Sequence, residues 1–136
     1  MENKRPQVGV GVIISKDDKI LFNKRKGSFA SGEYGTTGGH LEFGESFGHG
    51  IMREIEEENG LKIKNLKWLH VANIIKYAPE HFIDITFTAD WESGHPIILE
   101  PGACEQWLWQ NPDTVTFPIL EPSKLALQAL KDPKFN

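Results

Sequence analysis

The chain has 136 residues, 39% hydrophobic and 25% charged, which is typical of one globular domain over residues 1–136 and excludes a disordered chain. The formal net charge of −4 provides no basic footprint for extended nucleic acid. A single cysteine, Cys104, excludes an internal disulfide framework and predicts a reducing, cytoplasmic location, and no apolar run is long enough for a signal peptide or a membrane span.

The chain begins with a predicted β-hairpin. Residues 8–15 alternate β-branched side chains with Gly9 and Gly11, which predicts a strand, and residues 19–24 supply the return strand. A glycine inside a strand indicates close approach of a ligand or of another backbone. Both explanations remain open for these two glycines.

A short basic run, residues 24–26, closes the hairpin and has Arg25 at its centre. Such a run is most often a solvated edge, but a guanidinium also pairs bidentately with phosphate oxygens. Residues 34–37 then predict a brief strand that ends at Gly38 and Gly39.

The next predicted element is an acidic helix. Ser46 is suited to be its N-cap, and Asn59-Gly60 is suited to end it in a left-handed conformation. On a helical wheel of roughly 100° per residue, Ile51, Met52 and Ile55 form an apolar arc that faces the core.

Three carboxylates occupy the neighbouring arc of this helix. Glu54, Glu57 and Glu58 are three and four residues apart, a spacing at which like charges repel one another. Gly50 lies above them on the wheel and is expected to leave space beside them, whereas Glu56 points to solvent. Carboxylates without thiols or a histidine cluster favour Mg²⁺, with Mn²⁺ as a substitute. The residues alone therefore leave two alternatives, a divalent metal site or an exposed acidic helix.

The second half of the chain predicts three more strands and a helix. Residues 63–77 predict a long strand, and because both faces are largely apolar between residues 68 and 75 it is expected to be a central strand covered on both sides. Residues 82–91 and 104–110 predict two further strands. Residues 122–131 predict the last helix. The aromatic side chains near this end either pack in the core or stack on a base; they are Trp107, Trp109 and Phe117.

The stretch from Gly38 to Leu61 resembles the Nudix box, which is glycine, five residues, Glu, seven residues, and Arg-Glu-apolar-any-Glu-Glu-any-Gly-apolar. The matching positions are Gly39, Glu45, Arg53, Glu54, Ile55, Glu57, Glu58, Gly60 and Leu61. The segments GVGVIIS, LFNKRKGS, GGHLEFGES and EPGACEQWLW are similar to the MutT-type nucleoside triphosphate diphosphatases, with most likeness to their mammalian MutT-homologue branch.

This resemblance implies an α/β fold, an α/β/α sandwich with a central mixed sheet in which the box forms a loop–helix–loop. It also implies site residues. The metal ligands would be the carboxylates of Glu54, Glu57 and Glu58 with the carbonyl of Gly38. Arg53 would orient the carboxylates, Glu45 would brace the loop, and Arg25 would contact phosphate.

The general base is left open among a box glutamate, Glu100 and Glu105. Other residues expected at the substrate are Gly9, Gly11, Thr37, Gly39 and Phe117. Thr37 replaces a proline found in many relatives, and it either loosens the loop or adds a hydroxyl near the substrate.

The resemblance implies Mg²⁺-dependent hydrolysis of nucleoside triphosphates, canonical or oxidised, to nucleoside monophosphate and pyrophosphate. The alternatives are a nucleoside diphosphate linked to a sugar, an RNA 5′ end, or a non-catalytic module that binds a nucleotide. A homodimer is a further expectation.

Overall fold

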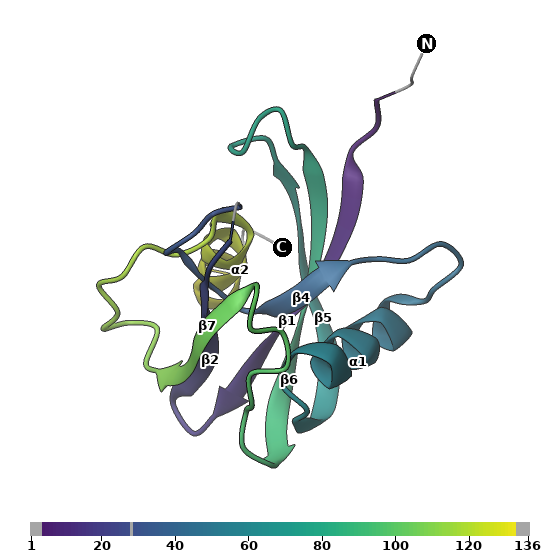
Figure 1. The fold of residues 1–136 in the computed structure, drawn as a ribbon. Coiled ribbons are helices and arrows are strands. Elements are labelled where there is room, and N and C mark those ends of the chain that lie inside the picture. The colour runs from purple at the N-terminus through teal and green to yellow at the C-terminus, as the bar shows by residue number, and fades with distance from the viewer. Residues whose placement is uncertain (1–3, 28, 133–136) are drawn as a thin grey trace.

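The computed structural model of the protein describes residues 4–27 and 29–132, so Ser28 at the end of LFNKRKGS lies outside it. Within these residues, seven strands form one mixed sheet with two helices (Figure 1). The elements are β1 (Gln7–Lys16), β2 (Lys19–Arg25), β3 (Tyr34–Gly35), β4 (Thr37–His40), α1 (Phe47–Glu58), β5 (Lys62–Ile74), β6 (Phe82–Ser93), β7 (Cys104–Gln110) and α2 (Glu121–Lys131). The predicted α/β class with a mixed central sheet is confirmed.

Strand β1 is the centre of the sheet. It runs parallel to β6 along one edge, and on its other edge it pairs antiparallel with β4 and then with β2. The path continues from β2 to β3 and from β6 to β5, with β7 paired to β2. This arrangement joins the glycines of β1 to both β4 and β6.

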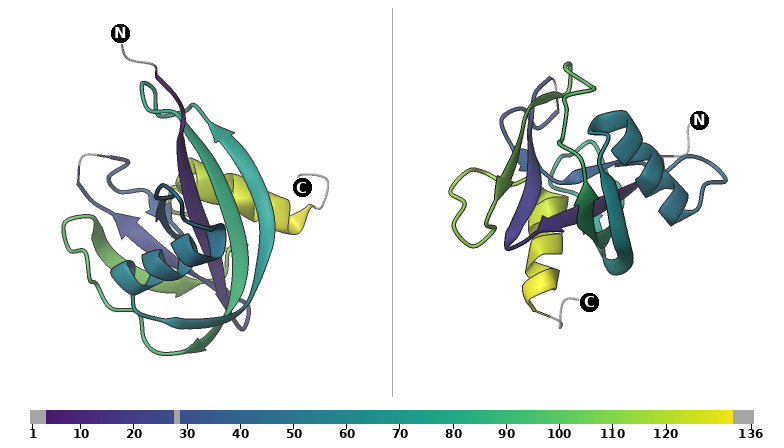
Figure 2. Two further views of the ribbon diagram at one scale, coloured as in Figure 1. Left: turned by 90° about the vertical axis from the view of Figure 1, so that its right-hand side faces the viewer. Right: turned by 90° about the horizontal axis from the view of Figure 1, so that it is seen from below.

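The two helices cover opposite faces of the sheet (Figure 2). Val10 and Val12 of β1 pack under α1 with Ile51 and Ile55. Ile13, the residue after Val12, belongs to a second buried cluster, which includes side chains of α2. Side chains on the two faces of β1 thus contribute to the two core clusters, as expected for a strand covered on both faces.

One side chain of the predicted apolar arc is misplaced. Ile51 and Ile55 are 1% exposed, whereas Met52 is 46% exposed. Met52 lies about 100° around the helix from Ile51, and this angle takes it beyond the contact with the sheet.

The prediction of a central strand over residues 63–77 was wrong. Strand β5 ends the sheet path, and among the described residues it pairs with β6 alone. Trp68 and Val71 are about half exposed, at 52% and 49%. These two apolar side chains of β5 are therefore only half covered.

The predicted brief strand over residues 34–37 is two strands. The chain changes partner at Thr36, because β3 pairs with β2 and β4 pairs with β1. Gly38 and Gly39, expected to follow the strand, lie inside β4 opposite Gly11 and Val10. In the described part of the chain, no helix is long and apolar enough to cross a membrane.

Candidate functional site

Helix α1 is fixed at both ends by side chains. At its start, the His49 N–H donates to Ser46 Oγ at 3.2 Å. At its end, fully buried Asn59 donates from Nδ2 to Thr37 Oγ1 at 3.1 Å, and its Oδ1 accepts from the Leu61 N–H at 3.1 Å. The Thr37 hydroxyl therefore attaches the helix to β4, and its expected place near the substrate stays a prediction.

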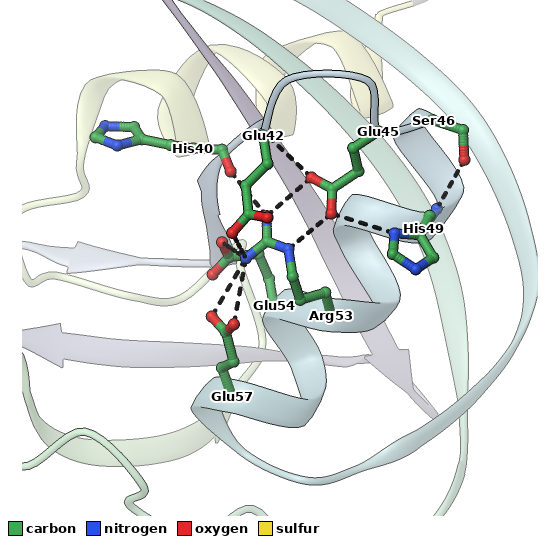
Figure 3. Close-up of polar contacts among 8 residues, drawn as sticks. All are labelled: His40, Glu42, Glu45, Ser46, His49, Arg53, Glu54 and Glu57. Carbon is green, nitrogen blue, oxygen red and sulfur yellow. Dashed lines mark hydrogen bonds and ion pairs between the residues drawn. The ribbon is translucent and has the colours of Figure 1, made fainter.

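Arg53 connects the loop before α1 to the acidic face of the helix (Figure 3). Its Nε lies 2.7 Å from Glu45 Oε2, and its Nη2 donates to the His40 carbonyl at 2.9 Å. Its Nη1 lies 2.8 Å from Glu54 Oε1 and 3.3 Å from Glu57 Oε2. A single guanidinium thus contacts three box carboxylates, those of Glu45, Glu54 and Glu57.

Glu45 is the loop's partner in this network. Besides Arg53, it accepts the Glu42 N–H at 2.9 Å, and these hydrogen bonds lower the pKa of Glu45 to about 2. A Cβ at Gly50 would lie 2.8 Å from Glu45 Oε1. Gly50 therefore makes room for Glu45, and the expectation that it clears the three carboxylates further along α1 was wrong.

Glu54 and Glu58 form a buried acidic pair. Each is 8% exposed, and Glu58 Oε1 accepts the Gly38 N–H at 3.1 Å. Burial raises the pKa of both carboxyls, and the charges of Glu54 and Glu100 raise the pKa of Glu58 further. Glu57 lies apart from the pair, with its side chain 48% exposed against Arg53.

The predicted metal site is partly assembled. In the part of the chain that the structure describes, no three His, Cys, Asp or Glu side chains are arranged to hold a metal ion. Glu54 and Glu58 are together, Glu57 is turned to Arg53, and Gly38 presents its N–H to Glu58. Two adjacent buried carboxylates nevertheless have the donor chemistry of a site for a hard divalent cation. Gly39 supports this pair, because a Cβ there would overlap the Glu54 carboxylate.

A cavity of about 250 Å³ lies beside the acidic pair, and its lining includes Arg25, Glu54, Glu58, Glu100, Asn23 and Trp107. Asn23 Oδ1 and Trp107 Nε1 are buried without a hydrogen-bond partner among the described residues. Such groups are costly unless a ligand or water satisfies them. The sequence analysis missed Asn23, although an amide inside the apolar run of β2 was a signal for it.

The two candidate bases outside the box lie in different places. Glu100 lines the small cavity. Glu105 forms a surface ion pair with Lys24 at 2.8 Å, and its side chain is 51% exposed. The structure therefore brings Glu100, and not Glu105, to the acidic pair.

A larger cavity of about 670 Å³ adjoins the first, and the two share Arg25, Gly38, Gly39 and His40. Aromatic side chains contribute to its wall, namely Phe29, Tyr77 and Phe82. This volume is within the range of small-molecule sites.

Gly9 and Gly11 line this larger cavity, and both explanations for the glycines have support. A Cβ at Gly11 would lie 3.2 Å from the Thr37 carbonyl, which is close approach of a backbone. Thr37 also lines the cavity. Phe117 packs instead in the second core cluster, with its ring centroid 3.9 Å from that of Tyr34. The structure thus places Phe117 away from both cavities, contrary to its predicted role at the substrate.

Comparisons with known proteins match most of the chain. A family model described as the NUDIX domain matches residues 5–130. The crystal structure of a MutT NUDIX hydrolase from Burkholderia pseudomallei superposes with a TM-score of 0.88 at 32% identity, covering 93% of this chain and 99% of that chain.

Two curated relatives match over part of their length. An ADP-ribose pyrophosphatase of Methanocaldococcus jannaschii is 42% identical over 88 residues, which are 62% of this chain and 51% of the relative. An NAD-capped RNA hydrolase NudC of Shigella dysenteriae is 28% identical over 134 residues, which are 96% of this chain and 49% of the relative. The chain thus spans about half the length of these two proteins.

Proposed function

The chain belongs to the Nudix family, and from this premise we propose that it catalyses Mg²⁺-dependent hydrolysis of nucleoside triphosphates to nucleoside monophosphate and pyrophosphate. The coarser activity, hydrolysis of a phosphoanhydride bond, follows from the family and from the likeness to the MutT hydrolase. The triphosphate substrate, canonical or oxidised, is the proposal.

The observation that carries the proposal is the junction of the two cavities. The small cavity holds the acidic pair of Glu54 and Glu58, and the large one is walled by aromatic rings. Arg25 lines both cavities, and in the described residues it forms no ion pair with a carboxylate. An unpaired guanidinium between an acidic site and an aromatic site suits phosphates that join a metal to a base.

The residues can be given roles in an in-line displacement. Glu54, Glu57 and Glu58 would hold Mg²⁺, with Glu57 leaving Arg53 to do so, and the bound cation would neutralise charge that develops on the phosphates. Arg25 binds a phosphate oxygen, and Glu100 accepts a proton from the attacking water. That water forms a bond to the β-phosphorus, and the monophosphate leaves with the bridging oxygen. Whether Glu100 or a box glutamate is the base remains a prediction.

Asn23 and Trp107 would complete the polar lining of the small cavity. The Asn23 Oδ1 can accept a hydrogen bond from water, and the Trp107 Nε1–H can donate a hydrogen bond to a phosphate oxygen. Both atoms lack partners in the described protein, so a filled site would satisfy them.

A second candidate is a substrate in which a nucleoside diphosphate is linked to a sugar or to an RNA 5′ end. The 42% identity to an ADP-ribose pyrophosphatase favours it. A non-catalytic nucleotide-binding module is disfavoured, because every glutamate of the box is present. The mammalian-branch likeness, the single domain, the cytoplasmic location and the homodimer remain predictions.

A substrate panel with Mg²⁺ or with a chelator tests the proposal. Release of pyrophosphate from a nucleoside triphosphate, dependent on Mg²⁺, is the expected result. Turnover of ADP-ribose or a nucleotide sugar without turnover of triphosphates would favour the second candidate. No turnover with tight binding would favour the module.

Variants of α1 locate the activity. Glu54→Gln and Glu58→Gln should each reduce the hydrolysis rate by more than the roughly 10–100-fold that is typical of replacing a residue that only supports a metal ligand. Glu56→Gln, on the same helix but exposed, is the matched control and should retain activity. Equal activity of all three variants would contradict the site.

A further inference from the structure

Two buried polar atoms without partners belong to residues that face each other across neighbouring strands. Asn23 lies on β2 and Trp107 on the adjacent β7 (Figure 1), and the two are directly opposite in the antiparallel register. Opposite residues of such a pair point to the same face of the sheet, with Cβ atoms about 4.5–5.5 Å apart. Neither Asn23 Oδ1 nor Trp107 Nε1 has a hydrogen-bond partner among the described residues.

The pair lies on the face of the sheet that α1 covers. Leu21, two residues earlier on β2, is opposite Trp109, and both side chains pack with the core cluster under α1. Side chains two residues apart on a strand share a face, so Asn23 and Trp107 form the next cross-strand pair on this face. At this pair the apolar core ends and the small cavity begins, which the acidic pair of α1 also lines.

Packing alone does not explain an amide at this position. Asn23 is 4% exposed, and Leu21 on the same face is fully buried. A leucine would fill such a position without leaving a polar atom unpaired, whereas a buried amide oxygen without a partner destabilises the fold. A buried, unpaired group that lines a cavity therefore indicates a bound partner in that cavity.

The two atoms together require a partner that both donates and accepts hydrogen bonds. Asn23 Oδ1 only accepts, and Trp107 Nε1–H only donates. The oxygens of an ionised phosphate chain accept hydrogen bonds and donate none, so a phosphate would satisfy Trp107 and leave Asn23 unpaired. One water molecule satisfies both, because its oxygen accepts from Trp107 while one of its hydrogens is donated to Asn23. Such a water keeps one hydrogen and one lone pair for other contacts.

We propose that Asn23 and Trp107 hold the water that attacks the phosphoanhydride. The inference rests on the proposed function, because it names the residues that orient the nucleophile of that reaction. The remaining lone pair of the water forms the bond to the β-phosphorus, and the electron pair of the broken P–O bond leaves on the nucleoside monophosphate. The remaining hydrogen passes as a proton to a carboxylate of the same cavity, Glu100 in the proposed mechanism. The hydrogen donated to Asn23 stays on the pyrophosphate.

Asn23→Leu separates this role from a structural one. The variant removes the unpaired oxygen at similar size, so the melting temperature of the ligand-free protein should rise. It should nevertheless lower kcat at least about 10-fold and change KM by less than about 3-fold, because orientation of the water is lost while the substrate contacts remain. A variant that is more stable than wild type and equally active would show that Asn23 holds no reacting water.

Trp107→Phe removes the indole N–H and keeps an aromatic ring. It should also lower kcat at least about 10-fold, with KM within about 3-fold of wild type. Trp109→Phe is the matched control, since it makes the same change at the neighbouring cross-strand pair, outside the lining of the small cavity. The control should keep kcat within about 3-fold of wild type. Equal losses in the two variants would overturn the inference, because they would follow from packing alone.

Binding of an uncleavable substrate distinguishes a contact with water from a contact with phosphate. The α,β-methylene analogue of the hydrolysed substrate, titrated by calorimetry with Mg²⁺, should bind Asn23→Leu and Trp107→Phe within about 3-fold of wild type. Binding to Trp107→Phe that is at least about 10-fold weaker would place the indole on a phosphate and would overturn the inference.

The kinetic comparison uses whichever phosphoanhydride the wild-type protein hydrolyses, ADP-ribose included. Hydrolysis of ADP-ribose without hydrolysis of triphosphates would contradict the proposed function, and a loss of kcat in Asn23→Leu and Trp107→Phe on that substrate would still support the inference. Triphosphate hydrolysis that both variants retain at the wild-type kcat would overturn the inference and leave the proposed function intact.

Discussion

Arg53 shows how one side chain can organise a site at the residue scale. It contacts Glu45, Glu54 and Glu57 and also the backbone of His40. A guanidinium offers five donors in a planar fork, and a lysine ammonium cannot reproduce that geometry. Arg53 is therefore a positioning residue, which acts through the carboxylates that it holds.

Replacement of this fork tests that role. Arg53→Lys should lower kcat/KM by about 10–100-fold, the range for residues that support metal ligands. The KM for Mg²⁺ should rise in the same variant, an effect that a loss of fold stability alone would not produce. The measurement is a Mg²⁺ titration of the initial rate beside a melting curve. An unchanged Mg²⁺ dependence would show that Arg53 does not position the ligands.

Glu45 adds a pH dependence at the same scale. Its pKa is lowered to about 2 in the folded protein by Arg53 and by the Glu42 N–H, against an ordinary value of 4.5. A lowered carboxyl pKa gives stability that is present above the unfolded value and is lost as the pH falls from about 4.5 to about 2. Glu45→Gln should therefore melt at a lower temperature than wild type at pH 7, with the difference shrinking through this window. A difference that is constant from pH 7 to pH 2 would contradict the ion pair.

At the scale of elements, Asn59 couples helix α1 to strand β4. It ends the helix, and its side chain bonds both Thr37 of β4 and the Leu61 N–H while remaining fully buried. This coupling keeps Glu58 next to Gly38, and Glu54 next to Gly39, at the contact between α1 and β4. The Asn59 amide thus joins the helix that carries the acidic pair to strand β4, beside the hydrogen bond from the Gly38 N–H to Glu58.

Asn59→Ala should lower the free energy of unfolding by about 2–3 kcal/mol, since it leaves buried polar groups of Thr37 and Leu61 without partners. Glu56→Ala, exposed near the same end of the helix, is the control and should change stability by less than about 0.5 kcal/mol. Chemical denaturation of both variants provides the comparison. If the two variants were equally stable, the Asn59 side chain would not be what stabilises the contact between α1 and β4.

At the scale of the whole molecule, what could be predicted from the sequence depends on distance along the chain. The limits of α1 follow from Ser46 and Asn59, which are local signals, and the structure confirms them. The place of β5 at the edge of the sheet depends on which strands pair with it, and no local pattern contains that information.

The candidate site shows the same division. The box motif brought the acidic residues to attention, but a helical wheel contains only the helix, and so it assigned Gly50 to the wrong carboxylates. The contact between Gly9 and Asp84 joins two strands that are far apart in the chain. The sequence does not state which residues of two distant strands face each other, and the structure of the sheet supplies that information.

The described residues bring an acidic pair, the Arg25 guanidinium and an aromatic cavity to one junction, and the central claim is that a phosphoanhydride is cleaved there. The most direct measurement is hydrolysis of a nucleoside triphosphate with Mg²⁺ in ¹⁸O-labelled water, with mass analysis of both products. We predict label in pyrophosphate, unlabelled nucleoside monophosphate, and loss of the reaction in Glu58→Gln. Label in orthophosphate or in the monophosphate, or full activity of Glu58→Gln, would contradict the account.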